Sequence, residues 1–154
     1  MSENRTLLTD MADGLFAELA TADCAAAWPR LAEAGFATLL VPEDKGGFGG
    51  DWGDLFAVLR LAGSHALAAP LGETIVAHKL LAEAGIEAPD GPIALLDRGY
   101  ASFGRDCAAV LAPGEGGLKL YPQAALTLTH GTSPDGNPRA MIPRNTSGVP
   151  PRSE

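Results

Sequence analysis

The hydrophobic positions in the first part of the chain recur at steps of three and four residues. An α-helix completes one turn in about 3.6 residues, so this spacing gathers apolar side chains on one face. The pattern predicts four helices, over Thr6–Ala20, Asp23–Ala34, Asp51–Leu61 and Gly72–Ala84. Their predicted inward-facing residues are Leu7, Leu8, Met11, Leu15, Phe16 and Leu19 in the first, Trp28, Leu31 and Ala32 in the second, Leu55, Val58, Leu59 and Ala62 in the third, and Ile75, Val76, Leu80 and Leu81 in the fourth.

Polar residues and glycines mark the ends of these helices. Asp23 and Asp51 are placed to accept hydrogen bonds as N-caps, and Asp54, three residues after Asp51, can complete a capping box. Gly35 and Gly85 follow the second and fourth predicted helices, and glycine is typical of the residue after a helix C-terminus.

The pattern changes near Asp90, where glycine, proline and short apolar runs begin to dominate. Short apolar runs between turn residues predict strands. We expect these over Ile93–Leu96, Cys107–Ala112, Leu118–Tyr121, Ala124–Thr129 and Arg139–Ile142. The second and third form a hairpin around a Pro-Gly-Glu-Gly-Gly turn, and a Ser-Pro-Asp-Gly turn precedes the last. The predicted fold class is α+β, with a four-helix domain over residues 1–89, a small antiparallel β domain over 90–142 and a flexible tail over 143–154.

Composition narrows the class of protein. The 154 residues are 46% hydrophobic and 6% aromatic, and alanine is so frequent that we expect a core of small, closely packed side chains. The net charge of -8 repels phosphate backbones, so nucleic-acid binding is not expected. Cys24 and Cys107 are isolated and are expected to be small buried hydrophobes rather than a disulfide framework. With no membrane-spanning run and no signal-peptide pattern, a cytoplasmic protein is expected.

One segment has the order of a nucleotide-binding site. The apolar run Phe36–Val41 precedes Gly46-Gly-Phe-Gly-Gly50 and then a predicted helix, and a strand, glycine loop and helix is how phosphate-binding folds begin. The third glycine of the dinucleotide fingerprint is missing, however, and no Gly-Lys-Ser/Thr follows. Asp51 and Asp54 also place negative charge where a phosphate would bind. We therefore interpret the segment as a glycine-rich connection between helices.

The stretch over residues 28–85 resembles the N-terminal helical domain of acyl-CoA dehydrogenases, which are flavoenzymes. That family has an apolar helix ending in Glu-x-Gly, an apolar run into Val-Pro-Glu, and Gly-Gly-x-Gly, and WPRLAEAGFATLLVPEDKGGFGG over residues 28–50 has all three in order. The next two predicted helices, over residues 54–85, resemble the following two of the family and include Pro-Leu-x-Glu-Thr at residues 70–74. Residues 93–142 resemble the family's middle β-domain more weakly.

The sequence departs from the family pattern in the segments that bind the flavin and provide the catalytic base. The Thr-Glu-Pro and Gly-Ser-Asp segments that hold FAD in the family do not occur here, and neither does a C-terminal helical domain. In the family, that domain usually provides the catalytic glutamate that removes the α-proton of the acyl thioester. The resemblance therefore implies a chain that is not active alone, with no catalytic residue of its own, and whose FAD is carried by a partner chain.

The resemblance also implies a location for substrate contacts. In the family, the helix that corresponds to Gly72–Ala84 lines the end of the acyl pocket, so Leu71, Thr74, Ala77 and His78 are candidates for contact with an acyl tail. A packed or surface histidine is the competing interpretation of His78. Other titratable candidates have weaker support: His65 and His130 lie in predicted turns, Glu43 reads as a solvated loop residue, and Glu73 reads as a favourable charge at a helix N-terminus. Arg139, Arg144 and Arg152 are candidates for coenzyme A phosphates or ordinary surface charges. No spacing typical of metal ligands is present.

Three hypotheses remain open from the sequence. The first is a subunit of a heteromeric acyl-CoA dehydrogenase, supporting α,β-dehydrogenation of an acyl-CoA thioester with a full-length dehydrogenase-like partner or as a homo-oligomer. This hypothesis predicts an exposed apolar patch where the family's C-terminal domain would dock. The second is a non-catalytic acyl-binding or protein-interaction module. The third is a fragment of a longer enzyme.

Overall fold

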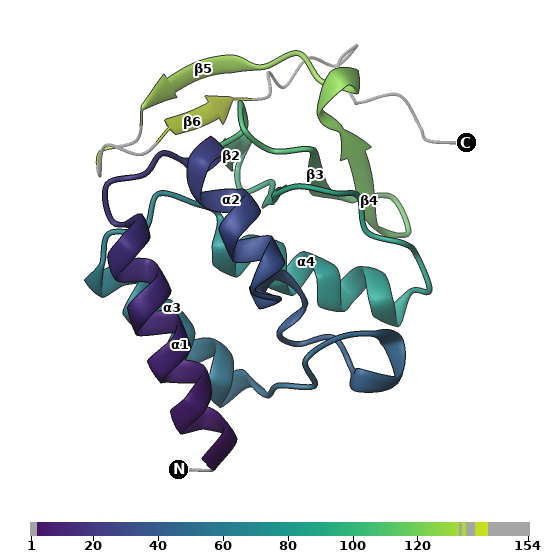
Figure 1. Cartoon of the computed structure of the whole chain (residues 1–154). Coiled ribbons are helices and arrows are strands. Elements are labelled where there is room, and N and C mark those ends of the chain that lie inside the picture. The colour runs from purple at the N-terminus through teal and green to yellow at the C-terminus, as the bar shows by residue number, and fades with distance from the viewer. Residues whose placement is uncertain (1–2, 133, 135–137, 142–154) are drawn as a thin grey trace. The chain divides into compact units, whose positions relative to one another are not determined.

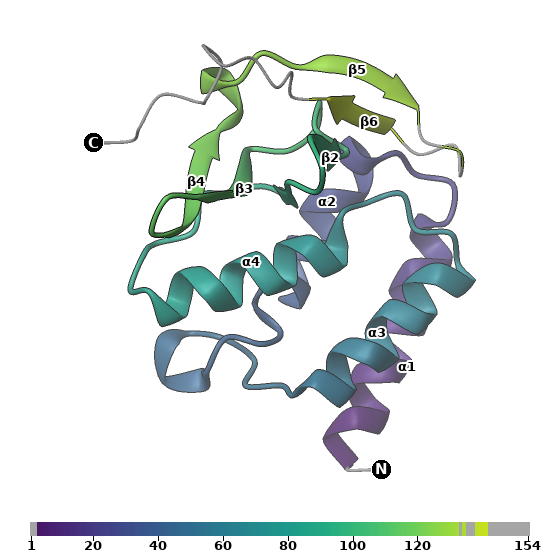
Figure 2. The same ribbon diagram turned by 180° about the vertical axis from the view of Figure 1, so that it is seen from behind.

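The computed structural model describes residues 3–132, 134 and 138–141. The chain divides into two compact units, a helical unit over residues 1–88 and a β unit over residues 89–154. Figures 1 and 2 show the two units from opposite sides. The described residues thus have the predicted α+β composition, while residues 143–154 lie outside the described part of the chain.

The helical unit contains the four predicted helices, α1 (Glu3–Leu19), α2 (Cys24–Glu33), α3 (Trp52–Ser64) and α4 (Leu71–Glu83). Two short 3₁₀ turns, η1 (Phe36–Thr38) and η2 (Glu43–Lys45), lie between α2 and α3. The apolar run that begins at Phe36 is therefore not a strand. Helices α1 and α3 lie side by side in both views (Figures 1 and 2).

Capping hydrogen bonds and a left-handed glycine mark the helix ends, as predicted. The Asp23 carboxylate accepts from the backbone N–H of Ala26 at 2.9 Å and caps α2. Asp51 and Asp54 form the capping box of α3, in which each carboxylate accepts from the other residue's backbone N–H. Gly35 follows α2 with a φ of 82°, a left-handed conformation that glycine adopts without a Cβ clash.

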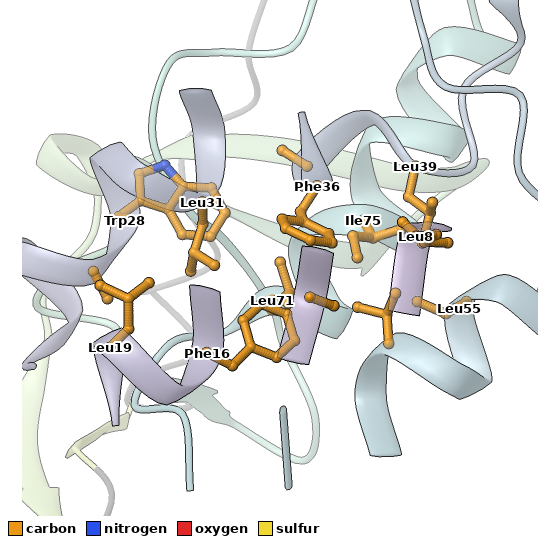
Figure 3. Packing of buried hydrophobic residues seen from close by; sticks show 14 of the residues in the cluster. Leu8, Phe16, Leu19, Trp28, Leu31, Phe36, Leu39, Leu55, Leu71 and Ile75 are labelled. Carbon is orange, nitrogen blue, oxygen red and sulfur yellow. The ribbon is translucent and has the colours of Figure 1, made fainter. Parts of the chain in front are cut away.

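The core of the helical unit is built from large side chains. Figure 3 shows Phe16, Phe36 and Leu71 pointing toward one another, with Trp28 and Leu31 nearby. The Phe16 and Phe36 rings are tilted with their centroids 5.2 Å apart, a favourable arrangement for two aromatic quadrupoles. The expectation of a core made from small side chains is therefore wrong for this unit.

The predicted apolar faces were too wide. Leu8, Phe16 and Leu19 of α1 are buried as expected, but Leu7 and Met11 are exposed by 66% and 42%. Ala12 takes the buried position instead, so the buried row advances by four, four and three residues. Ala32 of α2 and Leu59 of α3 are also exposed. Each helix is covered along only part of its circumference, and apolar residues at the edge of the stripe remain in solvent.

The β unit consists of two three-stranded sheets. One has the order β1-β3-β4, from β1 (Ile93–Leu95), β3 (Ala109–Gly114) and β4 (Gly117–Pro122). The other has the order β2-β6-β5, from β2 (Tyr100–Ser102), β6 (Pro138–Met141) and β5 (Thr129–Thr132). The β3–β4 hairpin was predicted. The antiparallel prediction holds for all pairs except β1–β3, which is parallel and sets Ala94 beside Val110.

Two features of the β unit differ from the prediction. Strand β2 was missed, although Asp97 and Tyr100 exchange two backbone hydrogen bonds across Arg98 and Gly99, both with positive φ. That pattern is a type I′ turn, for which Asp-x-Gly is a weak signal. The predicted strand over Ala124–Thr129 is instead the 3₁₀ turn η3 (Gln123–Ala125) followed by β5.

The Gln123 side chain explains the second difference. Its amide nitrogen donates to the carbonyl oxygens of Gly104 and Arg105, each at 2.7 Å, and its backbone N–H donates to Ala108. These bonds hold the chain in a turn where an apolar-polar alternation alone favours a strand.

Candidate functional site

The four residues predicted to contact an acyl tail lie together on α4. A helix turns by about 100° per residue, so Leu71, Thr74, Ala77 and His78 fall within an arc of about 120°. Leu71 belongs to the core of the helical unit. Thr74 and Ala77 are fully buried, and the Thr74 hydroxyl donates to the Pro70 carbonyl oxygen at 2.8 Å. Only His78 has a partly exposed side chain, so it marks the accessible edge of this face.

His78 is a half-buried imidazole. Burial lowers the pKa of His78 below its ordinary value of 6.5, because a partly desolvated site disfavours the charged form. At neutral pH this side chain is therefore a neutral hydrogen-bonding group rather than a cation.

The other titratable candidates do not converge on this face. The His65 ring lies 2.7 Å from the Asp13 carboxylate, which joins the end of α3 to α1. Glu43 is exposed in η2. Glu73 lies in the first turn of α4, as its favourable charge predicts. The Arg139 guanidinium lies over the Tyr100 ring at 3.9 Å, while Arg144, Arg152 and the side chain of His130 lie outside the described structure.

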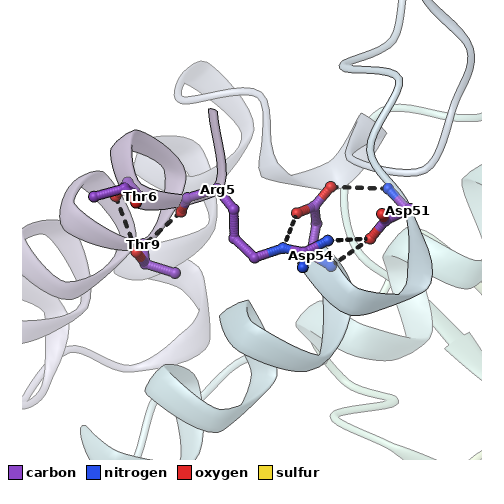
Figure 4. A network of polar contacts seen from close by, with 5 residues as sticks. All are labelled: Arg5, Thr6, Thr9, Asp51 and Asp54. Carbon is purple, nitrogen blue, oxygen red and sulfur yellow. Dashed lines mark hydrogen bonds and ion pairs between the residues drawn. The ribbon is translucent and has the colours of Figure 1, made fainter. Parts of the chain in front are cut away.

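A polar network fixes the start of α3 against α1 (Figure 4). Arg5 reaches Asp54 through Nε at 2.6 Å and Asp51 through Nη2 at 2.7 Å. Hydrogen bonding from the Asp54 backbone N–H, with Arg5 nearby, lowers the pKa of Asp51 below its ordinary 3.8. Because both carboxylates are already used by the cap and by Arg5, this network orients a helix and has no free acid or base.

The glycine-rich connection has a structural explanation. Backbone N–H groups of Phe48, Gly49 and Gly50 donate back to the carbonyl oxygens of Thr38, Val41 and Leu39. A Cβ on Gly47 would lie 2.1 Å from the Val41 carbonyl oxygen, so no side chain fits there. The loop N–H groups are therefore bonded within the protein and are not directed at a phosphate, which agrees with the sequence interpretation.

The β unit has a shallow hollow of about 290 Å³, lined by Arg105, Gln123, Leu126 and Leu128. Its Gln123 amide is already bonded to two carbonyl oxygens. The lining includes no carboxylate, histidine or nucleophile. It therefore has no pair of groups for acid–base or covalent catalysis.

A row of exposed apolar side chains lies on α3. Trp52, Phe56 and Leu59 are exposed by 58%, 70% and 36%. They follow one another at steps of four and three residues, so they share one face of the helix. The sequence predicted an exposed apolar patch where the family's C-terminal domain would dock, and that location stays a prediction. The row on α3 itself was not predicted. It was missed because Leu59 was assigned to the core.

Comparison with solved structures supports the fold. The chain superposes on the steroid acyl-CoA dehydrogenase Tcur3481–Tcur3483 with a TM-score of 0.64 and 20% identity, over 92% of this chain and 55% of the other. It superposes on the ChsE4–ChsE5 complex of Mycobacterium tuberculosis with a TM-score of 0.65 and 16% identity, over 92% and 54%. The sequence matches no family profile and no curated protein.

The chain has an acyl-CoA dehydrogenase-like fold. It spans about half the length of the two chains on which it superposes. At these identities the likeness concerns the fold, and the activity of those proteins does not transfer with it.

Within this acyl-CoA dehydrogenase-like fold, no buried side-chain nitrogen or oxygen among the described residues lacks a hydrogen-bond partner. The loop between β2 and β3 packs closely against β6, because a Cβ on Gly104 would lie 2.3 Å from the Cβ of Ala140. Neither observation identifies a residue that would hold a flavin.

Neither a metal-binding cluster nor a membrane-spanning helix is present among the described residues. They contain no group of three or more His, Cys, Asp or Glu side chains that could hold a metal ion. No described helix combines the length and apolar character needed to cross a membrane.

Proposed function

We propose that this chain is one subunit of a two-chain, flavin-dependent acyl-CoA dehydrogenase, and that a longer dehydrogenase-like partner carries the FAD and the catalytic base. The observation that carries this proposal is the acyl-CoA dehydrogenase-like fold, which the chain shares with Tcur3481–Tcur3483 and ChsE4–ChsE5. Both of those proteins are named for two components. The proposed reaction of the assembly is α,β-dehydrogenation of an acyl-CoA thioester.

The role of this chain in that assembly is structural, because it forms one end of the acyl site. In the proposal, α4 supports one end of the acyl site, with Leu71 and Thr74 anchoring the helix in the core. His78, the partly exposed member of the four, then lies closest to the acyl tail. A neutral His78 suits this place, because a desolvated cation beside an alkyl chain is unfavourable.

The test is the visible spectrum of the purified protein. The chain is expressed alone and then together with acyl-CoA dehydrogenase-like chains from the same genome. We expect a colourless protein alone, and a yellow complex with flavin bands at about one flavin per pair of chains in the co-expressed sample. Reduction of those bands by an acyl-CoA would establish the reaction class. Stoichiometric flavin on this chain alone would contradict the proposal.

The second candidate function is an interaction module without a role in catalysis. The burial of Thr74 and Ala77 favours protein interaction over acyl binding for such a module. A complex that forms but stays colourless would support it. A rise in melting temperature with acyl-CoA, in the absence of any partner, would instead favour acyl binding.

A further inference from the structure

The exposed row on α3 is set apart from the core-facing side of the same helix. Leu55 and Val58 are buried and hold α3 on the helical unit. Trp52, Phe56 and Leu59 lie on a different side and are exposed by 58%, 70% and 36%. Isolated exposed apolar residues are ordinary, but two aromatic residues and a leucine in one row make a contiguous patch.

Helix α4 provides a second wall beside this row. Gly72 of α4 lies so close to Leu59 that an added Cβ would be 3.1 Å from both Leu59 Cδ atoms. Farther along α4, Lys79 Nζ lies over the Trp52 ring, 5.9 Å from its centroid. The row on α3 and this flank of α4 therefore form one shelf, which we define as Trp52, Phe56, Leu59, Gly72 and Lys79.

An exposed arginine lies beside the shelf. Arg60 directly follows Leu59, is exposed, and has no ion pair with any residue that the structure describes. Lys79 is paired with Glu83 at 2.6 Å, on an exposed edge of α4, so these two charges offset each other. Arg60 therefore adds a positive charge beside the apolar row. It favours an acidic group on whatever covers the shelf.

We propose that this shelf docks an amphipathic helix of the flavin-bearing partner chain, with an apolar stripe on Trp52 and Phe56 and an acidic residue facing Arg60. This inference rests on the proposed function, which supplies the partner. Apolar positions spaced by four and three residues along α3 form a ridge of the kind that packs against another helix. Large aromatic residues on such a surface are the residue types that dominate binding energy.

A second copy of this chain fits the shelf less well. In a symmetric dimer the same surface meets itself, and the shelf as defined includes no carboxylate to face Arg60. The acidic residue that we propose on the partner helix supplies that carboxylate.

The test uses the co-expressed complex and two matched variants of the full chain. Trp52→Ser with Phe56→Ser removes the centre of the shelf, and Leu118→Ser removes a similarly exposed apolar side chain, 53% exposed, from β4. We expect the double variant to weaken binding at least about 100-fold, with loss of co-elution, because large aromatic residues dominate the binding energy of such surfaces. Leu118→Ser is expected to bind as the original chain does.

Arg60→Glu tests the electrostatic part. Because its side chain is exposed, the variant is expected to fold normally, to bind about tenfold more weakly, and to reverse the salt dependence of association. Circular dichroism and melting curves confirm that each variant is folded. Unchanged binding by the double variant would overturn the docking proposal, as would a homodimer that the double variant abolishes.

The outcomes also separate this inference from the proposed function. A colourless complex that depends on the shelf would retain the docking site and overturn the flavoenzyme subunit. A yellow complex whose binding is unchanged by both shelf substitutions would support the flavoenzyme subunit and overturn the docking site. Failure to form a complex with any dehydrogenase-like chain would overturn the docking site.

Discussion

The helical unit and the β unit fill their interiors with side chains of different size. The helical core is filled by Phe16, Trp28 and Phe36 and by leucines. The buried strand residues of the β unit are mostly small or β-branched, with Ala101 and Ala140 fully buried and Gly104 packed against Ala140. One interior depends on the volume of large side chains, and the other on close approach of the backbone. The first should therefore be sensitive to lost volume and the second to added volume.

The aromatic residues that report on unfolding are divided between the same two units. Both tryptophans, Trp28 and Trp52, lie in the helical unit, and both tyrosines, Tyr100 and Tyr121, lie in the β unit. Tryptophan fluorescence consequently reports unfolding of the helical unit. Near-ultraviolet circular dichroism or NMR of the tyrosine rings reports the β unit.

The largest expected effect is loss of volume in the helical core. Phe36→Ala removes a ring that is 1% exposed and packs against the Phe16 ring, and should lower the free energy of unfolding by about 3–5 kcal/mol. Urea unfolding followed by tryptophan fluorescence measures it. Phe56→Ala, the same substitution at a 70% exposed position, should change stability by less than about 0.5 kcal/mol. Equal losses in the two variants would contradict the distinction between the core and the shelf.

The second largest effect is expected from added side-chain volume in the β unit. Gly104→Ala puts a methyl group 2.3 Å from the Ala140 Cβ, so β6 must shift, at a cost of about 1–3 kcal/mol. The expected loss appears in the tyrosine signals. Gly131→Ala in β5 is the control, because its added Cβ would meet nothing within 4 Å. A β unit that tolerates alanine at position 104 would show that its packing is looser than the backbone approach indicates.

A smaller effect is expected from a helix cap. Asp23→Ala removes the acceptor of the Ala26 N–H at the start of α2 and should cost about 1 kcal/mol, detected by tryptophan fluorescence through Trp28. Asp23→Asn preserves an oxygen acceptor and should restore most of the loss. If asparagine is as destabilising as alanine, the cap contributes through its charge instead.

The smallest effect concerns pH and His78. The folded state lowers its pKa below 6.5, so the unfolded chain binds a proton more readily. The stability that this neutral histidine provides is therefore fully present above pH 6.5. It declines as the pH falls from there to the lowered pKa. His78→Gln should flatten the pH dependence of unfolding as the pH falls below 6.5, and a slope that the substitution leaves unchanged would assign it to other groups.

The candidate site was partly accessible from the sequence. Resemblance brought Leu71, Thr74, Ala77 and His78 to one helix, and the structure places them on one face of α4. Their burial could not be deduced, because it depends on what packs over that face. The shelf was missed for the same reason: Leu59 has the spacing of a core residue and yet lies 36% exposed against Gly72.

The sequence by itself determined the features that depend on neighbouring residues. Helix periodicity, the Asp23 cap, the Asp51–Asp54 capping box and the left-handed Gly35 each require only residues within about one turn. The tertiary structure decided everything that joins distant segments. The parallel β1–β3 pair, the Gln123 bonds that replace a strand by a turn, and the choice of Ala12 over Met11 for the core all depend on partners far along the chain. Such partners compete for the same surface, and local preference is too weak to decide between them.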